Sequence, residues 1–555
     1  MIARPADLSS RAQLLLRMRA WAATWWREAV PFAALTAVGL GLRLVQLDEK
    51  PLHHDETLHV WFSWQLATGN GYSYDPVYHG PVQFYVIALA YLLFGIGDYV
   101  AHVPIAVAGT IAIFLPFFLR RQLGTVAALT ASVAICLAPA WLYFSRFVRE
   151  DIHVATITLG LTVVLLRFFD RPRPWQPVAF GTLLALSFAT KETTYITVAV
   201  FGAFFAAAVA IQAVRARRAG GRLLDAALVR GMTSLGAAPW AWGVACFLLV
   251  YTLLFSTFLT NPEGLQEGLW GSIDYWLGQQ DVNRGGQPWF YYLVLIPAYE
   301  WPIVLLGLGG VVVALRRRTM THLFLVWMLL ATLAVFSWAS ERMPWLVLHP
   351  LLPLTLLAGI GAQALWASRR RPLAIAASAV VVLAAAGALY HSVGLSYFRS
   401  ADARELYVQV QTADDVPPVR DRIMQLEDAW IREHGEPFVP VVDRWGGTGW
   451  PWGWYLRDVG SGYYDMSVPD DVEVGPLVLV AEPNHEAMKP KLRGYTGERF
   501  RLRVWWVPVW GAAGPGDWLR WAVSRRAWGP TPTATMDEFL YLRPDIARLL
   551  DERPD

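Results

Sequence analysis

Apolar runs long enough to cross a lipid bilayer recur through the first 395 residues, and they constrain the fold more than any other feature. A membrane-spanning helix needs about 20 mostly apolar residues, because the hydrocarbon core offers no water to pair with the backbone. The chain is therefore predicted to be a polytopic α-helical membrane protein with about 11 transmembrane helices. The predicted spans are 28–47, 101–119, 124–143, 152–169, 176–190, 193–212, 235–259, 290–314, 321–338, 345–366 and 373–393.

Short arginine-rich segments predict how these helices are oriented. They fall on one side of the membrane only if the shorter apolar run 81–97 does not cross it, and basic loops remain in the cytoplasm. We therefore predict that 81–97 is an interfacial or re-entrant helix inside a long first outer loop, 48–100. The C-terminus then lies outside the cytoplasm. The arginine-rich segments are 120–121, 171–173, 215–222, 316–318 and 369–371.

Composition changes near residue 396. Only 16% of the chain is charged, against about a quarter in soluble proteins, and the deficit lies in residues 1–395. The sequence thus predicts a transmembrane domain over 1–395 and an extracytoplasmic soluble α/β domain over 396–555. In the second domain a helix is predicted at 417–434, and strands are predicted at 437–442, 477–481 and 500–507.

Charge and cysteine content exclude some classes of protein. The net charge of +3 gives no support for nucleic-acid binding, which would need a basic patch. Cys136 and Cys246 both lie in apolar runs, so no disulfide framework is predicted for the C-terminal domain. The first apolar run lacks the small-residue cleavage site of a signal peptide, and we predict that it is a retained helix.

The first candidate site is the segment His53-His54-Asp55-Glu56-Thr57-Leu58-His59 in the first outer loop. It continues into an amphipathic run, so Asp55 and Glu56 are predicted at the start of a helix on the membrane surface. The same acids could serve only the helix, with Asp55 as its N-cap. The histidines do not have His-Glu-x-x-His spacing, so a zinc site is not expected.

Three further outer turns place acids next to bases beside a helix end. A cation in such a turn can bind a phosphate. In the simpler interpretation these are interfacial ion pairs that anchor helix ends, and the lysine only extends to the membrane surface. The three sequences are Arg149-Glu150-Asp151, Lys191-Glu192 and Glu341-Arg342.

The loop from Gly278 to Tyr292 contains Asn283-Arg284-Gly285-Gly286 between two predicted spans. Paired glycines give a mobile or tightly turned backbone. A long loop at this place could close over a substrate as a lid. It could equally be a simple connector.

Taken in order, these motifs resemble the GT-C superfamily of membrane glycosyltransferases, in the branch of protein O-mannosyltransferases and aminoarabinose transferases. They are similar still more closely to the flippase activity-associated protein family, found near archaeal N-glycosylation genes. The resemblance covers almost the whole chain. The stretches that carry it are HHDETLH, SRFVREDIH, FATKET, RGGQPWFYY and WPWGWYLRD.

The resemblance implies an enzyme that moves a sugar from a polyprenyl phosphate to a hydroxyl of a glycan, lipid or protein, on the extracytoplasmic face. Attack from the side opposite the lipid would invert the anomeric centre. The implied catalytic acids are Asp55 and Glu56, and the implied ligands of the donor phosphate are Arg149, Lys191 and Arg342. Further contacts to the substrate are implied for His54, His59, Glu150, Asp151, Glu192, Arg284 and Glu341.

A divalent cation is left open by the sequence. Mg²⁺ and Mn²⁺ prefer oxygen ligands, and Asp55 and Asp151 are the residues that would hold one. No other cofactor is expected.

The C-terminal domain departs from the oligosaccharyltransferase pattern. The acceptor-recognition motif WWDYG is missing, and Trp450-Pro451-Trp452-Gly453-Trp454-Tyr455 stands in the chain instead. This argues against transfer of a whole glycan to asparagine. The aromatic cluster could stack on sugars, touch lipid headgroups or pack within the protein.

Two other functions fit a polytopic chain. One is a flippase for lipid-linked glycans, and the other is a non-catalytic component of a glycan assembly complex. A transporter is expected to carry charges near the bilayer midplane and to have repeated halves. Here the charges gather at helix ends on one side, and the sequence shows no repeated half.

Overall fold

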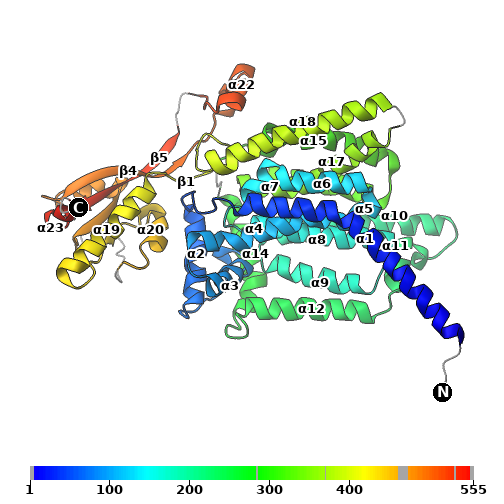
Figure 1. Ribbon diagram of the computed structural model, residues 1–555. Coiled ribbons are helices and arrows are strands. Elements are labelled where there is room, and N and C mark those ends of the chain that lie inside the picture. The colour runs from blue at the N-terminus through cyan, green and yellow to red at the C-terminus, as the bar shows by residue number, and fades with distance from the viewer. Residues whose placement is uncertain (1–4, 283–285, 369–370, 460–472, 530–532, 551–555) are drawn as a thin grey trace.

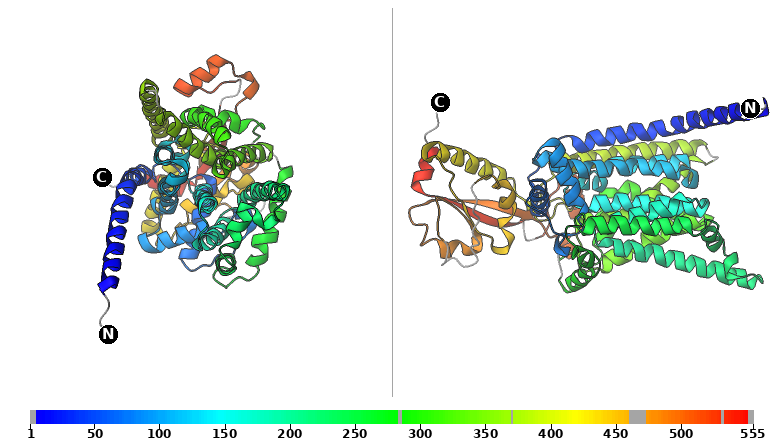
Figure 2. Two further views of the ribbon diagram at one scale, coloured as in Figure 1. Left: turned by 90° about the vertical axis from the view of Figure 1, so that its right-hand side faces the viewer. Right: turned by 90° about the horizontal axis from the view of Figure 1, so that it is seen from below.

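Long helices lie side by side in one part of the molecule, and a sheet of five strands lies beyond one end of them (Figure 1). The computed structural model describes residues 5–282, 286–368, 371–459, 473–529 and 533–550. The first helix, α1 (Pro5–Leu44), runs along the outside of the bundle, and its N-terminal part leaves it (Figure 2).

Eight helices of the described residues are long and apolar enough to cross a membrane. They coincide with eight of the predicted spans, so the prediction of a polytopic helical membrane protein is confirmed. The first of them extends from α4 through a 3₁₀ turn into α5 (Arg120–Leu123). The eight are built on α4 (Asp98–Phe114), α8 (Asp151–Asp170), α10 (Thr193–Arg218), α12 (Ala238–Phe255), α15 (Tyr291–Arg317), α16 (Met320–Trp338), α17 (Leu348–Trp366) and α18 (Arg371–Val393).

The other three predicted spans are not among these eight helices. Residues 28–47 fall largely in α1, and 176–190 correspond to α9 (Trp175–Phe188), which packs against α8 and α12. The prediction of one continuous helix over 124–143 is wrong. α6 (Thr125–Leu137) stops there and α7 (Pro139–Phe144) begins, because proline has no N–H to continue the helical hydrogen bonds.

Short helices gather at the end of the bundle that faces the C-terminal domain (Figure 1). They are α2 (His54–Ala67), α3 (Val82–Phe94) and α14 (Ser272–Gly278), and the first two run across the long helices. α3 has 13 residues, too few to span a bilayer, which agrees with the prediction for 81–97. The arginine-rich α5 and the end of α10 lie at the opposite end of the bundle (Figure 1).

The C-terminal domain is built on a sheet with the strand order β1-β4-β5-β3-β2. β2 and β3 pair in parallel, and the other neighbours are antiparallel. The predicted helix is present as α19 (Val416–His434), whereas two of the strands, β1 and β5, are not predicted. The strands are β1 (Gln411–Thr412), β2 (Val441–Val442), β3 (Leu477–Ala481), β4 (Thr496–Trp505) and β5 (Ala534–Leu542).

The remaining helices are short. Two connect membrane-length helices, and four belong to the C-terminal domain. They are α11 (Ala227–Thr233), α13 (Gly264–Gln266), α20 (Gly449–Tyr455), α21 (His485–Met488), α22 (Pro515–Ser524) and α23 (Pro544–Ala547).

The aromatic cluster of α20 packs within the protein and joins the two parts of the molecule. The indole of Trp454 is fully buried, donates a hydrogen bond to Asp98 Oδ1 at 2.7 Å and stacks on Tyr91 of α3. Trp452 is equally buried and donates to Glu538 Oε2 at 2.7 Å inside the sheet domain. These two side chains therefore follow the packing interpretation of the motif, and α20 fixes the sheet domain against α2.

Candidate functional site

The start of α2 is fixed by a reciprocal cap. The His53 ring accepts a hydrogen bond from the Asp55 amide at 3.1 Å, and Glu56 Oε2 accepts one from the His53 amide at 2.7 Å. Such a capping box satisfies amide groups that the first helical turn leaves unpaired. The N-cap is thus His53, and the alternative role of Asp55 as N-cap is wrong.

Glu56 faces the protein interior. Its carboxylate is fully buried, lies 3.0 Å from Lys50 Nζ, and accepts a hydrogen bond from the Val148 amide at 2.7 Å. Burial alone would raise the pKa of Glu56, but Lys50 and the hydrogen bonds hold it below its ordinary value. Glu56 therefore ties the first outer loop to the turn before α8.

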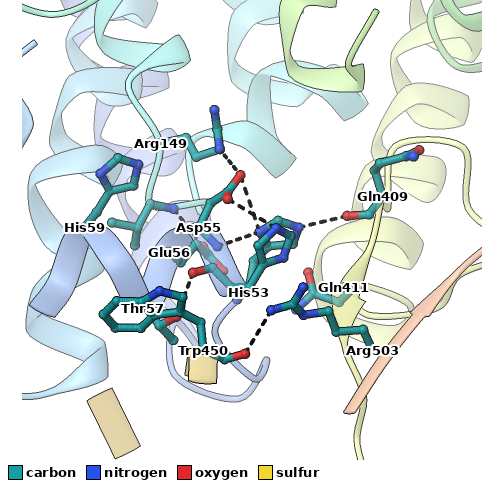
Figure 3. A network of polar contacts seen from close by, with 12 residues as sticks. His53, Asp55, Glu56, Thr57, His59, Arg149, Gln409, Gln411, Trp450 and Arg503 are labelled. Atoms are coloured by element: carbon teal, nitrogen blue, oxygen red, sulfur yellow. Dashed lines mark hydrogen bonds and ion pairs between the residues drawn. The ribbon is translucent and has the colours of Figure 1, made fainter. Parts of the chain in front are cut away.

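Asp55 faces a pocket and forms an ion pair with Arg149 (Figure 3). Its side chain is 30% exposed, whereas Arg149 is buried with its guanidinium 4.2 Å above the Trp345 ring. Burial opposes ionisation of Asp55, but the neighbouring His54 and the ion pair with Arg149 outweigh it and keep the pKa of Asp55 well below its ordinary value. Asp55 is therefore a carboxylate at neutral pH.

A second ion pair lies behind the first. Lys191 Nζ donates to both oxygens of Asp151, each at 2.9 Å, and both side chains are buried. Arg149 Nε lies 3.7 Å from Asp151 Oδ2, so Asp55, Arg149, Asp151 and Lys191 form one chain of alternating charges. The structure thus brings together the first outer loop, the turn before α8 and the turn before α10.

Two pockets meet at this chain of charges. Of the two, the first has the larger share of polar lining, and it is lined in part by Asp55, His54, His59 and Arg149. The second has Lys191 and Glu192 on one wall, and most of its remaining surface is apolar, from side chains of α10, α14, α16 and the turn before α17. The residues that line both pockets are His79, Trp276 and Glu341.

The other predicted site residues lie at different depths. His59 Nε2 lies 3.0 Å from Glu150 Oε1, both side chains are buried, and burial lowers the pKa of His59 to about 4. Arg342 donates to the backbone oxygens of Ser337 and Gln287, and it lines neither pocket. Unlike Arg149 and Lys191, Arg342 is therefore held by backbone carbonyl groups outside the two pocket linings. Arg284 lies outside the described residues.

Several lining residues are absent from the sequence prediction. His79 comes from the turn before α3, and Tyr275 and Trp276 come from α14. Gln409 lies in the segment that enters the sheet domain, and its carbonyl oxygen is 2.9 Å from His53 Nε2 (Figure 3). Aromatic and amide residues in outer loops follow no periodic sequence pattern. They are recognised as pocket residues only once the fold shows that they lie close together.

The candidate metal ligands are already engaged. Asp55 is paired with Arg149, and Asp151 is paired with Lys191. Each of the two carboxylates expected to bind a divalent cation therefore already has a positively charged partner. His53, His54 and Asp55 do offer ligand atoms within 4.8 Å of one another. His53, however, uses Nδ1 for the Asp55 amide and Nε2 for the Gln409 carbonyl. These residues do not fit a divalent cation.

Comparison with known proteins agrees with this architecture. Residues 78–229 match the family model described as dolichyl-phosphate-mannose-protein mannosyltransferase. ArnT from Cupriavidus metallidurans, solved with undecaprenyl phosphate bound, has a TM-score of 0.63 and 16% identity, over 93% of this chain and 98% of that chain. The chain has the GT-C fold. No curated protein matches it significantly in sequence.

A second solved structure supports the same fold. The archaeal oligosaccharyltransferase AglB from Archaeoglobus fulgidus, in complex with an inhibitory peptide and a dolichol-phosphate, has a TM-score of 0.52 and 14% identity. The similarity covers 79% of this chain and 64% of that chain. The narrower resemblance, to the flippase activity-associated family, stays a prediction.

Proposed function

We propose that this protein is a membrane glycosyltransferase that moves a sugar from a polyprenyl phosphate to an acceptor hydroxyl on the extracytoplasmic face. The observation that carries the proposal is the Asp55–Arg149–Asp151–Lys191 chain of charges where a polar and an apolar pocket meet. The GT-C fold, and the lipid phosphates bound by its two solved relatives, support the choice of donor.

The two pockets suit the two ends of such a donor. The apolar pocket, with Ile196, Leu277 and Phe336 among its lining, suits isoprenoid units. The polar pocket suits the sugar, and the phosphate between them would lie near Arg149 and Lys191. Cations at this place stabilise the negative charge that develops on the departing phosphate.

Asp55 is the residue that fits the role of base. It is ionised, it is the exposed end of the charge chain, and it faces the polar pocket from which an acceptor can arrive. A lipid phosphate that draws Arg149 away would leave Asp55 more basic when the proton is transferred. Glu56, which has no surface on the pocket, supports the loop and takes no part in proton transfer.

The decisive experiment replaces the base without changing its shape. Membranes or purified protein are supplied with a set of polyprenyl-phosphate sugars, and transfer to acceptor is followed by mass. Asp55→Asn is expected to lower the transfer rate by about 10²–10⁴, the usual contribution of a positioned base. Glu49→Gln, an exposed acid of the same loop, is the matched control and is expected to keep the full rate.

Two outcomes would contradict the proposal. One is a folded Asp55→Asn protein with the wild-type rate. The other is movement of labelled lipid-linked sugar between the leaflets of reconstituted vesicles without any transfer, which would indicate a flippase. Inversion is tested separately by NMR of the product, since attack opposite the lipid changes the anomeric configuration.

A further inference from the structure

His79 occupies an unusual place in the backbone. It has φ 67° and ψ −164°, a region that almost only glycine adopts without strain. The turn is held by its neighbours, since the Gly80 amide donates to Thr190 O at 3.1 Å and the Val82 amide donates to Ala189 O at 2.9 Å. This pairing with the chain just before Glu192 places the His79 ring against that carboxylate.

The ring of His79 is buried and its orientation is determined on three sides. Nδ1 lies 2.8 Å from Glu192 Oε2, the ring stacks on Trp276 at 4.8 Å between centroids, and Nε2 lies 3.4 Å from Arg149 Nη2. Arginine can only donate, so Nε2 accepts and Nδ1 carries the hydrogen that is donated to Glu192. A carboxylate on Nδ1 fixes this tautomer and stabilises the ring when Nε2 becomes protonated.

The position of His79 points to one part of the donor. Its side chain lines both pockets, together with Trp276 and Glu341, and it contacts Arg149. A lipid that fills the apolar pocket and a sugar that fills the polar one are joined by the phosphate. His79 therefore lies where that phosphate would pass from one pocket to the other.

We propose that His79, oriented by Glu192, donates a proton from Nε2 to the departing phosphate; this rests on the proposed function. The bond between the anomeric carbon and the phosphate oxygen breaks, and its electron pair stays on that oxygen. The acceptor oxygen forms the new bond to carbon and gives its proton to Asp55. The imidazolium of His79 gives its proton to a phosphate oxygen, and water restores both groups.

Binding of the phosphate prepares this step. A phosphate oxygen can replace His79 as acceptor of the Arg149 N–H, which frees Nε2 to take up a proton while Glu192 balances the charge. The charged and titratable groups around His79 come from four segments of the chain. They are Glu192, Arg149, Glu150, His59 and Glu341.

The test measures how the affinity of the detergent-solubilised full chain for undecaprenyl phosphate depends on pH between 7 and 8.5. The free lipid phosphate is already doubly ionised there, because its second pKa is about 6. Uptake of one proton by His79 on binding is expected to make the wild-type affinity fall as the pH rises, by at most about tenfold per pH unit. His79→Gln keeps a hydrogen-bond donor but cannot take up a proton, and its affinity is expected to be weaker and independent of pH.

Further variants separate the possible results. Glu192→Gln is expected to flatten the wild-type pH dependence, and it tests the dyad even if His79→Gln does not fold. His434→Gln, an exposed histidine of α19, is the control and keeps the wild-type slope. Wild-type affinity that is tight but independent of pH overturns the role of His79 alone. Failure of the wild type to bind the lipid phosphate overturns the lipid-linked donor as well.

Discussion

Two adjacent carboxylates at the start of α2 have different surroundings. Successive side chains of a helix point about 100° apart, so Asp55 faces the pocket while Glu56 points into the protein. Glu56 is held by Lys50 and by the amides of His53 and Val148, and it has no exposed surface. Of the two adjacent acids, Asp55 faces the pocket and Glu56 fixes the loop.

Glu56→Gln is expected to destabilise the protein. The buried ammonium of Lys50 then loses its counter-charge, and breaking a buried ion pair costs about 3–5 kcal/mol of the free energy of unfolding. Thermal unfolding in detergent, followed by tryptophan fluorescence, measures the effect. Glu49→Gln is the control and is expected to leave the midpoint unchanged, because Glu49 is exposed.

The same carboxylate predicts a pH dependence. Since the folded-state pKa of Glu56 is depressed, its stabilisation is present above the unfolded pKa of about 4.3 and is lost as the pH falls below it. The unfolding midpoint of the wild type should therefore fall between pH 5 and pH 3 by more than that of Glu56→Gln. Equal changes in the two proteins would contradict this role.

At the scale of elements, hydropathy predicts helices well and turns poorly. The helix break at Pro139 follows from the sequence only when the proline is given more weight than the apolar run around it. β5 is not predicted, although it lies within the sheet and buries Glu538 against Trp452, because a buried acid interrupts the apolar pattern. His79 lies in a turn whose backbone is set by the distant segment 189–190. No local pattern contains that contact.

A buried ion-pair network fastens α22 to the helix bundle. Glu405 is fully buried, lies 2.9 Å from Arg525 Nε and also pairs with Arg399. Its other oxygen accepts a hydrogen bond at 2.6 Å from Tyr299, in the segment of α15 where the helix is kinked. Figure 1 shows α22 apart from the rest of the C-terminal domain, and this network, together with the buried Trp521, joins it to the bundle.

Glu405→Gln is expected to release α22. The cations Arg525 and Arg399 lose their counter-charge, and we expect a loss of about 3–5 kcal/mol. Hydrogen exchange is expected to rise first in Pro515–Ser524. Glu433→Gln is the matched control, because its pair with Arg548 is exposed and contributes about 0–1 kcal/mol. Unchanged exchange in α22 would mean that Trp521 and its neighbours hold the helix without the ion pairs.

At the scale of the whole molecule, the arginine-rich loops and the candidate site lie at opposite ends of the helix bundle. The arginines of α5 and of the end of α10 lie at one end of the bundle, and the pocket with the sheet domain lies at the other (Figure 1). Arginine-rich loops stay in the cytoplasm, because moving them across the membrane is unfavourable. On this basis we propose that the reaction takes place outside, where a polyprenyl-linked sugar can enter the apolar pocket from the bilayer.

This orientation is tested with single cysteines in a chain whose Cys136 and Cys246 are replaced by alanine. Ser524→Cys on α22 and Ala219→Cys at the end of α10 are both exposed positions. A maleimide that cannot cross membranes is expected to label Ser524→Cys in intact cells, or in spheroplasts if an outer membrane is present. It is expected to label Ala219→Cys only after the membrane is permeabilised. The reverse labelling pattern would place the pocket on the cytoplasmic side. Asp55 would then need a sugar donor in the inner leaflet. That result would contradict the proposed extracytoplasmic reaction.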